Sequence, residues 1–234
     1  MILPLEIRLA SDGTFARGDG VAGLVDAEVS YERATGLPYV RARVFRGLLV
    51  EACAEVLFQE QQIGPNGLPA WIAAAGFLFG QEGSKADAAG HLRPEPLRLP
   101  ASLRRAVWEA VETHRIKKEE VLASLTTIRR QTAIDPQRDA ARRGMLRSSR
   151  LVVRETMFET RLVFEEDPAE AMRERVLALT VASVYHVQRG GWRRNRGRGR
   201  LCSRFIEGGT TQQDVAEALA AFRKHFPPPE EGAV

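Results

Sequence analysis

The 234-residue sequence predicts an α+β fold, with a single domain over residues 1–234 built on a ferredoxin-like or RRM-type β-α-β-β-α-β core. Three observations support this prediction. The chain opens with an apolar residue at every second position, two later segments have helical spacing, and a short apolar run follows the second of them. Strands and helices therefore alternate in the order that this core requires.

The first predicted strand carries its apolar residues on one face, namely Leu3, Leu5, Ile7 and Leu9. Residues 11–23 are rich in glycine and aspartate and predict a loop, and residues 35–39 predict a turn. Helical spacing of apolar residues then runs from 44 to 58. The first strand and helix are thus expected within the first 60 residues.

Residues 60–125 predict an insertion into this core. Its first part holds many prolines and glycines and only short apolar islands, which is typical of a loop-rich segment. Short helices are expected at 103–116 and 119–125, the first with Leu103, Val107, Trp108 and Val111 on one side.

Residues 126–164 predict a protruding β-hairpin thumb, because β-type runs at 126–128 and 151–164 flank an arginine-rich middle. A helix should start at Asp167-Pro168, with proline in its first turn. A closing strand is expected at 201–206, and residues 207–234 predict a C-terminal helix followed by a solvated tail.

Positive charge is concentrated in two segments. Residues 129–154 hold eight arginines against Asp135 and Asp139, and residues 189–204 hold seven arginines and no acid. These segments carry +6 and +7, so the rest of a chain with net charge +4 must sum to −9. Such a patterned surface indicates a polyanionic partner, most simply nucleic acid.

The second basic segment combines arginine with glycine over residues 189–200. Glycine allows positive φ and close approach of the main chain to a ligand, and guanidinium groups chelate phosphate oxygens in pairs. A flexible Arg-Gly tail is the alternative, but apolar residues on both sides favour an ordered phosphate-binding loop. Its expected RNA-binding residues are Gly190, Gly191, Arg193, Arg194, Arg196, Gly197 and Gly199.

The first basic segment mixes arginines with isolated apolar residues, Ile134, Met145 and Leu146. An apolar tip between arginines could wedge into a base stack while the arginines hold the backbone. A merely solvated charged hairpin is the alternative. The expected RNA-binding residues here are Arg130, Ile134, Arg138, Arg142, Arg143 and Met145.

Asp26 follows the glycine-bearing loop and is the candidate catalytic and metal-binding residue. A carboxylate beside a phosphate-binding surface can hold Mg²⁺ or orient an attacking hydroxyl, although most such aspartates form turns or caps. The nearby arginines, Arg17, Arg41, Arg43 and Arg46, suggest that RNA passes close to it.

Residues 36–47 read Gly-Leu-Pro-Tyr-Val-Arg-Ala-Arg-Val-Phe-Arg-Gly and resemble the Gly-x-Pro-x-Ile-Pro-Gly-Ser-Ser-Leu-Lys-Gly signature of the RAMP superfamily of CRISPR-associated proteins. Residues 77–80 resemble its Leu-Phe-Gly element, residues 132–146 its thumb hairpin, and residues 191–199 its glycine-rich loop. The chain departs from the signature at 41–44, where the family usually has Pro-Gly-Ser-Ser, which indicates a divergent subtype.

The resemblance is greatest to the repeated backbone subunit of type III effector complexes. It implies that the chain binds guide RNA, that Asp26 cleaves complementary target RNA with Mg²⁺, and that its partners are copies of itself and other CRISPR effector subunits. It also implies that Arg43 and Arg46 contact guide phosphates and that Ile134 and Met145 displace one nucleotide. A catalytically inactive guide-binding scaffold and a guide-processing RAMP endonuclease remain as alternatives.

Other chemistries are disfavoured by the sequence. The four histidines, His91, His114, His186 and His225, have no partner at metal-ligand or triad spacing. Cys53 and Cys202 are too few for a disulfide framework, and neither a signal peptide nor a membrane-length apolar run is present. A cytoplasmic protein without a membrane partner is therefore expected.

Overall fold

The computed structural model of the chain describes residues 1–16, 18, 20, 25–63, 67–81, 89–132, 134–135, 137, 140–141 and 145–227. Its helices are α1 (Ala42–Ile63), α2 (Leu68–Phe79), α3 (Ala101–Glu112), α4 (Lys118–Leu125), α5 (Glu170–His186) and α6 (Gln212–His225), with short 3-10 turns at Arg194–Arg196 and Gly209–Thr211. Its strands are β1 (Ile2–Leu9), β2 (Leu92–Pro94), β3 (Thr126–Gln131), β4 (Ile134–Asp135), β5 (Ala140–Ala141), β6 (Arg147–Val152), β7 (Met157–Phe164) and β8 (Leu201–Phe205).

The central sheet has four strands in the order β2-β7-β1-β8, and each neighbouring pair is antiparallel. Counted along the core, the order is second, third, first and fourth strand, with α1 and α5 as the crossover helices. This is the arrangement of two interlocked β-α-β units. The α+β ferredoxin-like prediction is therefore confirmed.

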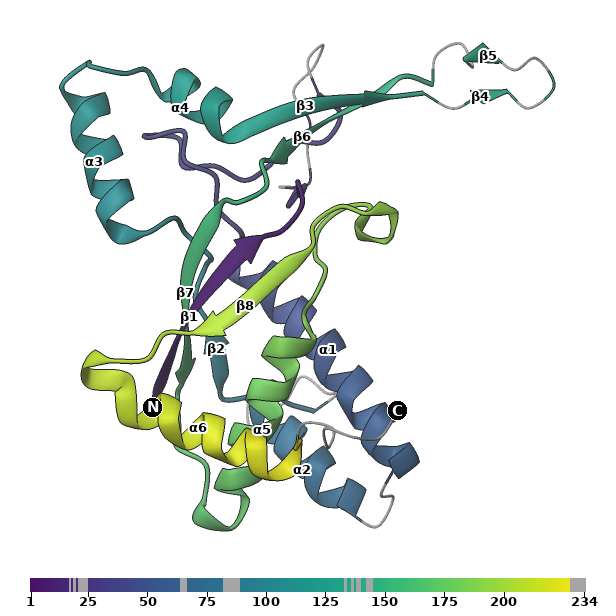
Figure 1. The fold of residues 1–234 in the computed structure, drawn as a ribbon, viewed down its shortest axis with the longest axis vertical. Helices are drawn as coiled ribbons and strands as arrows, with labels where there is room; N and C mark the ends of the chain where they lie inside the picture. The colour runs from purple at the N-terminus through teal and green to yellow at the C-terminus, as the bar shows by residue number, and fades with distance from the viewer. Residues whose placement is uncertain are drawn as a thin grey trace, which may run out of the picture.

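One face of the sheet is buried by helices. The alternate residues Leu3, Leu5, Ile7 and Leu9 of β1 are fully buried in one hydrophobic cluster with residues from α1, α2, α5 and α6. These four helices gather on one side of the molecule, whereas α3, α4 and the β3–β6 hairpin extend from the other end (Figure 1). Within the described residues, no helix combines the length and apolar character needed to cross a bilayer.

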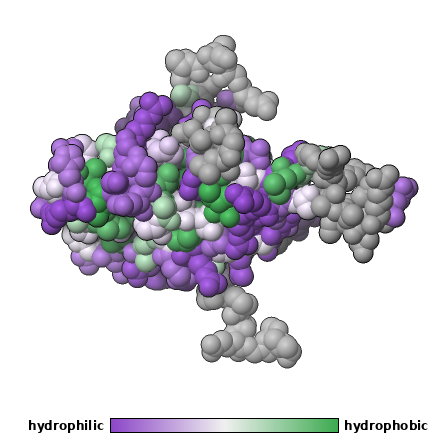
Figure 2. All heavy atoms as spheres, turned by 90° about the horizontal axis from the view of Figure 1, so that it is seen from above, coloured by the Kyte–Doolittle hydropathy of each residue, from purple (hydrophilic) through white to green (hydrophobic). Residues whose placement is uncertain are grey.

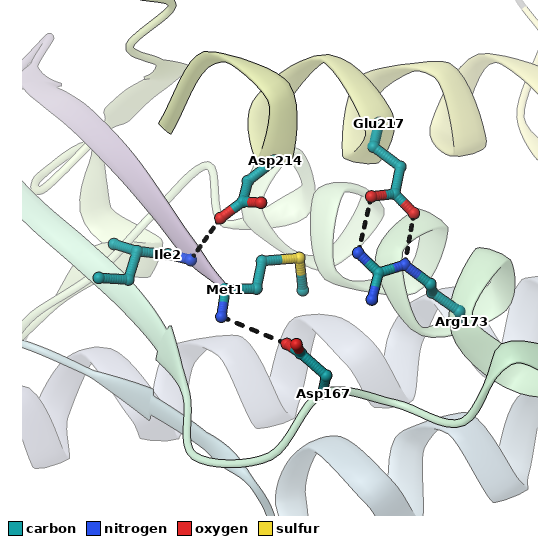
Figure 3. A network of polar contacts seen from close by, with 6 residues as sticks. All are labelled: Met1, Ile2, Asp167, Arg173, Asp214 and Glu217. Carbon is teal, nitrogen blue, oxygen red and sulfur yellow. Dashed lines mark hydrogen bonds and ion pairs between the residues drawn. The ribbon is translucent and has the colours of Figure 1, made fainter. Parts of the chain in front are cut away.

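Polar contacts fasten the start of β1 to the helical layer (Figure 3). The Met1 amino group pairs with Asp167 at 3.2 Å, and the Ile2 N–H donates to Asp214 in the first turn of α6 at 2.8 Å. Arg173 of α5 grips Glu217 of α6 with two bonds of 2.5 and 2.7 Å. These contacts thus hold β1, α5 and α6 in fixed positions relative to one another.

The opposite face of the sheet carries ion pairs. Glu6 pairs with Arg204 and Arg161 with Glu95, each at 2.7 Å. The residues of β1, β7 and β8 that point this way include no aromatic side chain, because Phe158, Phe164 and Phe205 are buried on the helical side. RRM domains bind RNA by stacking bases on aromatic residues of the sheet. The outward face of β1, β7 and β8 lacks those groups.

The second core strand differs from the prediction. It is β2, within the segment predicted as an insertion, and not the run at 126–128, which pairs outside the central sheet. β2 spans only three residues and contains Pro94. Proline is tolerated here because β2 lies at the sheet edge, but a short proline-containing run gives no strand pattern in the sequence.

The predicted hairpin over residues 126–164 is too long. β3 pairs with β6, but β7 is a central strand between β2 and β1. The apolar run at 151–164 is broken at Glu155, which has φ of 67°, and the Arg154 N–H donates to the Asp12 carboxylate at 2.9 Å. A polar turn therefore divides two strands that the sequence pattern joined.

Residues 68–79 form α2, not the loop that their proline and glycine and the flanking glycines suggested. Proline is accommodated in the first turn of the helix, and Gly80 ends it with φ of 84°. Trp71, Ala74 and Leu78 are buried against the core. Tertiary packing thus outweighs the local signals.

The other predicted helices and the closing strand are confirmed, with shifted ends. They are the helices at 44–58, 103–116 and 119–125, the helix after Asp167, and the strand at 201–206.

Candidate nucleic-acid interface

The β3–β6 hairpin has two chemically different faces. Arg129 lies opposite Ser149, and Gln131 lies opposite Arg147. Because side chains alternate along a strand and directly paired residues share a face, these four residues lie on one face, which we call the loop-side face. Arg130, Ser148 and Arg150 lie on the other, which we call the Asp26-side face.

The glycine-rich loop is closed by its own backbone. The Gly190 N–H donates to the Gly199 carbonyl at 2.8 Å, and the Gly199 N–H donates to the Asp12 carbonyl at 3.0 Å. A Cβ on Gly199, where φ is 62°, would lie 1.9 Å from the Gly190 oxygen, and one on Gly191 would lie 2.6 Å from the Thr14 oxygen. The loop is therefore ordered, and the close approach that requires these glycines is to the chain itself. The N–H groups of Gly190 and Gly199 do not face an anion, contrary to the phosphate-contact prediction.

The loop docks on the loop-side face of the hairpin through arginine side chains. Arg193, with φ of 59°, donates to the Gln131 side-chain oxygen. Arg198 Nη1 lies 3.4 Å from Ser149 Oγ, and Arg129 reaches back to Asp12 at 2.7 Å. The two basic segments of the sequence therefore meet at the hairpin base.

Three of these residues, Arg129, Arg193 and Arg198, form what we call the cationic cluster. Burial lowers the pKa of the Arg198 guanidinium, and the charges of Arg129 and Arg193 lower it further, whereas Asp12 acts in the opposite direction. Three positive charges thus lie close together, and the nearby Asp12 carboxylate pairs with one of them, Arg129. Neither Arg129 nor Arg198 was among the predicted contact residues; the position of Arg198 between two glycines was the available signal.

The remaining arginines of the loop differ from one another. Arg194 makes a bidentate pair with Glu51 of α1 at 2.6 and 2.5 Å, and these bonds hold the pKa of the Glu51 carboxyl below its usual value. Arg196 and Gly197 are exposed, and no ion pair of Arg196 is found with any described residue. Arg196 is thus available to a ligand, whereas Arg194 is neutralised internally.

The arginines of the signature-like segment are dispersed. Arg46 donates to the Phe79 carbonyl at 2.8 Å, where it satisfies the end of α2. Arg41 lines a separate pocket with Tyr39 and Arg98, and Arg43 is exposed. The structure therefore does not bring Arg41 or Arg46 into the cationic cluster.

Asp26 is exposed and fixed to the free edge of β6. Its Oδ2 accepts hydrogen bonds from the Ser148 N–H at 2.6 Å and the Ser148 hydroxyl at 3.3 Å, and its own N–H donates to the Ser148 carbonyl at 3.0 Å. Asp26 therefore lies at the base of the same hairpin as the cationic cluster, but on the other face.

A buried ion pair supports this placement. Arg150 Nε lies 2.8 Å from Glu28 Oε1, and its Nη1 donates to Thr126 on β3 at 3.1 Å. Glu28 is 1% exposed. Arg150 was counted with the basic surface, but it holds the Asp26 segment and both hairpin strands together. The alternation of acidic Asp26 and Glu28 with apolar neighbours was the sequence signal for this edge contact.

The fit of Mg²⁺ depends on Asp26. Across the described residues, no group of three or more His, Cys, Asp or Glu side chains is placed to hold a metal ion. Magnesium commonly binds proteins through one or two carboxylates, with water and substrate phosphates completing the shell. Asp26 could supply one such carboxylate oxygen, so the residues fit an ion that arrives with RNA.

Several predicted contacts fall outside the described residues. These are Arg17, Arg138, Arg142 and Arg143. Ile134 is described only through the backbone of β4, which pairs with β5. Met145 and Leu146 are described and are 39% and 63% exposed, so apolar side chains are available beside the hairpin arginines.

A pocket of about 410 Å³ lies between α1 and the loop and is lined by charged residues of both signs, including Glu51, Arg189 and Arg194. His186 on its wall lies 2.8 Å from Glu55.

Seen from the hairpin end, the surface of the molecule is mainly hydrophilic with separate small hydrophobic areas (Figure 2). This surface is suited to a charged ligand more than to an apolar one.

Fold and site together define a ferredoxin-like α+β protein with a protruding basic hairpin braced by a glycine-rich loop. No family profile and no curated protein sequence matches the chain. Solved structures share the fold, and two of them illustrate the similarity. One is a chain in the cryo-EM structure of the type III-B Cmr-beta bound to cognate target RNA, with a TM-score of 0.59 and 12% identity over 92% of this chain and 98% of that chain. The other is a chain in the type III-B Cmr-beta apo state, with a TM-score of 0.59 and 13% identity over 88% and 97%.

Proposed function

We propose that this chain is the backbone subunit of a type III CRISPR ribonucleoprotein, which holds guide RNA and cleaves the paired target RNA. The observation that carries the proposal is the meeting of the two basic segments at the hairpin base, where Arg129 pairs with Asp12 while Arg193 and Arg198 contact the neutral side chains of Gln131 and Ser149. The similarity in fold and length to Cmr-beta chains supports the same class of complex.

RNA binding follows from the charge and shape of this surface. Guanidinium groups from the loop and the hairpin would replace counterions along the RNA backbone. Met145 and Leu146 project beside the exposed Arg147, so an apolar contact with a base could accompany phosphate contacts. The ion-paired sheet face would remain outside the RNA path.

Cleavage is assigned to Asp26. The bond from the Ser148 N–H fixes one carboxylate oxygen, which leaves the other to act on a bound strand. In the proposed reaction, Asp26 accepts the proton of a ribose 2′-OH as that oxygen attacks the adjacent phosphorus and the 5′-oxygen leaves. A bound Mg²⁺ would neutralise charge on the phosphate. Duplex geometry opposes in-line attack, so displacement of a nucleotide by the hairpin would precede the reaction.

The test is target cleavage by the assembled complex carrying Asp26→Ala or Asp26→Asn. Both variants should lose cleavage while guide and target binding persist, because Asp26 is an exposed acid outside the cationic cluster. Glu119→Gln on the exposed surface of α4 is the matched control. Undiminished cutting by both Asp26 variants would refute the catalytic assignment.

A non-enzymatic scaffold is the second candidate. It is favoured by the absence, among the described residues, of a group of three or more His, Cys, Asp or Glu side chains placed to hold a metal ion. The scaffold would bind guide RNA on the same surface. Complexes that bind complementary RNA in Mg²⁺ without cutting it would establish this alternative.

A guide-processing endonuclease is the third candidate, and the His186–Glu55 pair beside the loop is the observation in its favour. Histidine next to a carboxylate can act as a general base. Incubation of the chain with unprocessed repeat RNA separates this reading from the others, since specific cleavage that is lost in His186→Ala would support it.

A further inference from the structure

Arg198 occupies an unusual place for an arginine. It lies near the end of the glycine-rich loop, between Gly197 and Gly199, whose φ angles are 75° and 62°. The left-handed conformations of Gly197 and Gly199 turn the chain on either side of Arg198, and Arg198 is only 6% exposed. The loop thus buries a guanidinium beneath the hairpin.

Among the described residues, no carboxylate pairs with the buried guanidinium of Arg198. Its hydrogen-bond partner in the described part of the chain is the neutral Ser149 hydroxyl at 3.4 Å, although a guanidinium has five N–H donors. Three other arginines of the hairpin and the loop have a carboxylate partner: Arg129 has Asp12, Arg150 has Glu28 and Arg194 has Glu51. Arg198 has none among the residues that the structure describes.

The surroundings add positive charge. Arg129 and Arg193 lie close enough to lower the pKa of Arg198, and the nearby Asp12 is engaged by Arg129. A buried cation without a counterion destabilises a fold, so such groups are found where a ligand supplies the missing charge. The positive charge around Arg198 therefore favours the binding of an anion.

We infer that Arg198 anchors a binding site for one phosphodiester group, with Arg129 and Arg193 beside it and the Ser149 hydroxyl as a neutral neighbour. The inference rests on the proposed function, because RNA supplies the phosphodiester. A planar guanidinium binds two phosphate oxygens at once, which matches the unused donors of Arg198.

The site also distinguishes between two RNA strands. Ser149 faces Arg198 and Ser148 faces Asp26, and successive residues of β6 point to opposite faces. Under the proposed function, the phosphate at Arg198 would belong to the guide strand, which is retained, whereas Asp26 would face the target strand, which is cut. Arg198 is a binding residue and not a catalytic one.

The experiment uses the full chain with Arg198→Met and the control Arg105→Met, which removes an exposed arginine of α3. Binding of a single-stranded RNA is measured at several salt concentrations. Arg198→Met should weaken binding by about tenfold and make the log–log salt slope shallower by about 0.7, the value for one lost phosphate contact. The control should match the wild type.

Thermal unfolding supplies a second readout. Without an anion, Arg198→Met should melt no lower than the wild type, because an uncompensated buried charge is removed. RNA or inorganic phosphate should raise the melting temperature of the wild type and have much less effect on the variant. Arg198→Gln, with the same expectations, replaces Arg198→Met where the latter does not fold.

Failure of this inference is separable from failure of the proposed function. A folded Arg198→Met variant with wild-type RNA affinity and salt slope overturns the inference and leaves RNA binding intact. If the wild type binds no RNA, the proposed function fails, and the effect of inorganic phosphate on the melting temperature tests the inference. An increase that is seen in the wild type and lost in Arg198→Met supports the anion site. An equal increase in both proteins overturns it. In the assembled complex, Arg198→Met should weaken binding of the guide RNA more than binding of target RNA to guide-loaded complexes, and the reverse order contradicts the strand assignment.

Discussion

The Asp26 carboxylate accepts a 2.6 Å hydrogen bond from the backbone N–H of Ser148 at the base of the hairpin. The donor belongs to the backbone, so the contact does not depend on the identity of the side chain at 148. It ties the position of Asp26 to β6, and the next residue, Ser149, contacts the glycine-rich loop. One strand thus connects the acid to the cationic cluster.

The pair between Glu51 and Arg194 predicts a variant with stronger RNA binding. Glu51→Gln removes a negative charge and releases the Arg194 guanidinium from its bidentate partner. RNA affinity should rise severalfold, and the salt slope should steepen by about 0.7. Glu112→Gln on the exposed end of α3 is the control, and equal affinity of the two variants would mean that Arg194 lies off the RNA path.

The buried pair between Arg150 and Glu28 predicts a large loss of stability. Arg150→Met leaves the Glu28 carboxylate buried without its partner, which should lower the free energy of unfolding by roughly 3–5 kcal/mol in denaturant titrations. The double variant Glu28→Gln with Arg150→Met should recover part of this loss. A single variant as stable as the wild type would show that the hairpin base does not depend on the pair.

Two loop glycines give a matched comparison. Gly199→Ala places Cβ 1.9 Å from the Gly190 oxygen, whereas Gly197→Ala meets no heavy atom within 4 Å and is strained only by its φ of 75°. Gly197→Ala should cost about 1–2 kcal/mol of unfolding free energy, and Gly199→Ala should cost more. RNA binding should fall further in Gly199→Ala. Equal effects would mean that the loop is not packed as described.

The pair between Glu217 and Arg173 predicts a pH dependence of stability. The hydrogen bond from Arg173 lowers the pKa of Glu217 in the folded chain. Its contribution is therefore present above the unfolded pKa of about 4.3 and is lost as pH falls through the lower folded value. The difference in unfolding free energy between wild type and Glu217→Gln should be largest near pH 6 and shrink below about pH 4. The effect should be small, because the Glu217 side chain is 40% exposed. A difference that grows with acid would contradict this pairing.

Much of the fold could be predicted because each long element shows its own burial pattern. The alternation in β1 and the helical spacing in α1 report which face is covered, whereas residues 176–184 of α5 are buried on every side. β2 and α2 could not be predicted in this way. A three-residue edge strand with Pro94, and a helix that begins with proline, depend on distant partners for their stability.

The site was predicted as two basic segments, but the pairing of individual arginines was not. Arg150 binds an acid 122 residues away in sequence, and Arg194 binds one 143 residues away. A charge count from the sequence treats both arginines as free positive charges, although a glutamate neutralises each of them in the fold. The reverse holds for Arg198, which looks like one arginine among many in the sequence and becomes distinctive only through its burial.

The most direct test of the central claim is the salt dependence of RNA binding by the wild-type chain. If the hairpin and the loop hold an RNA strand, log K should fall linearly with log salt concentration, with a slope of about −0.7 for each phosphate neutralised. A chain that binds no RNA at low salt, or whose binding does not change with salt, would contradict it.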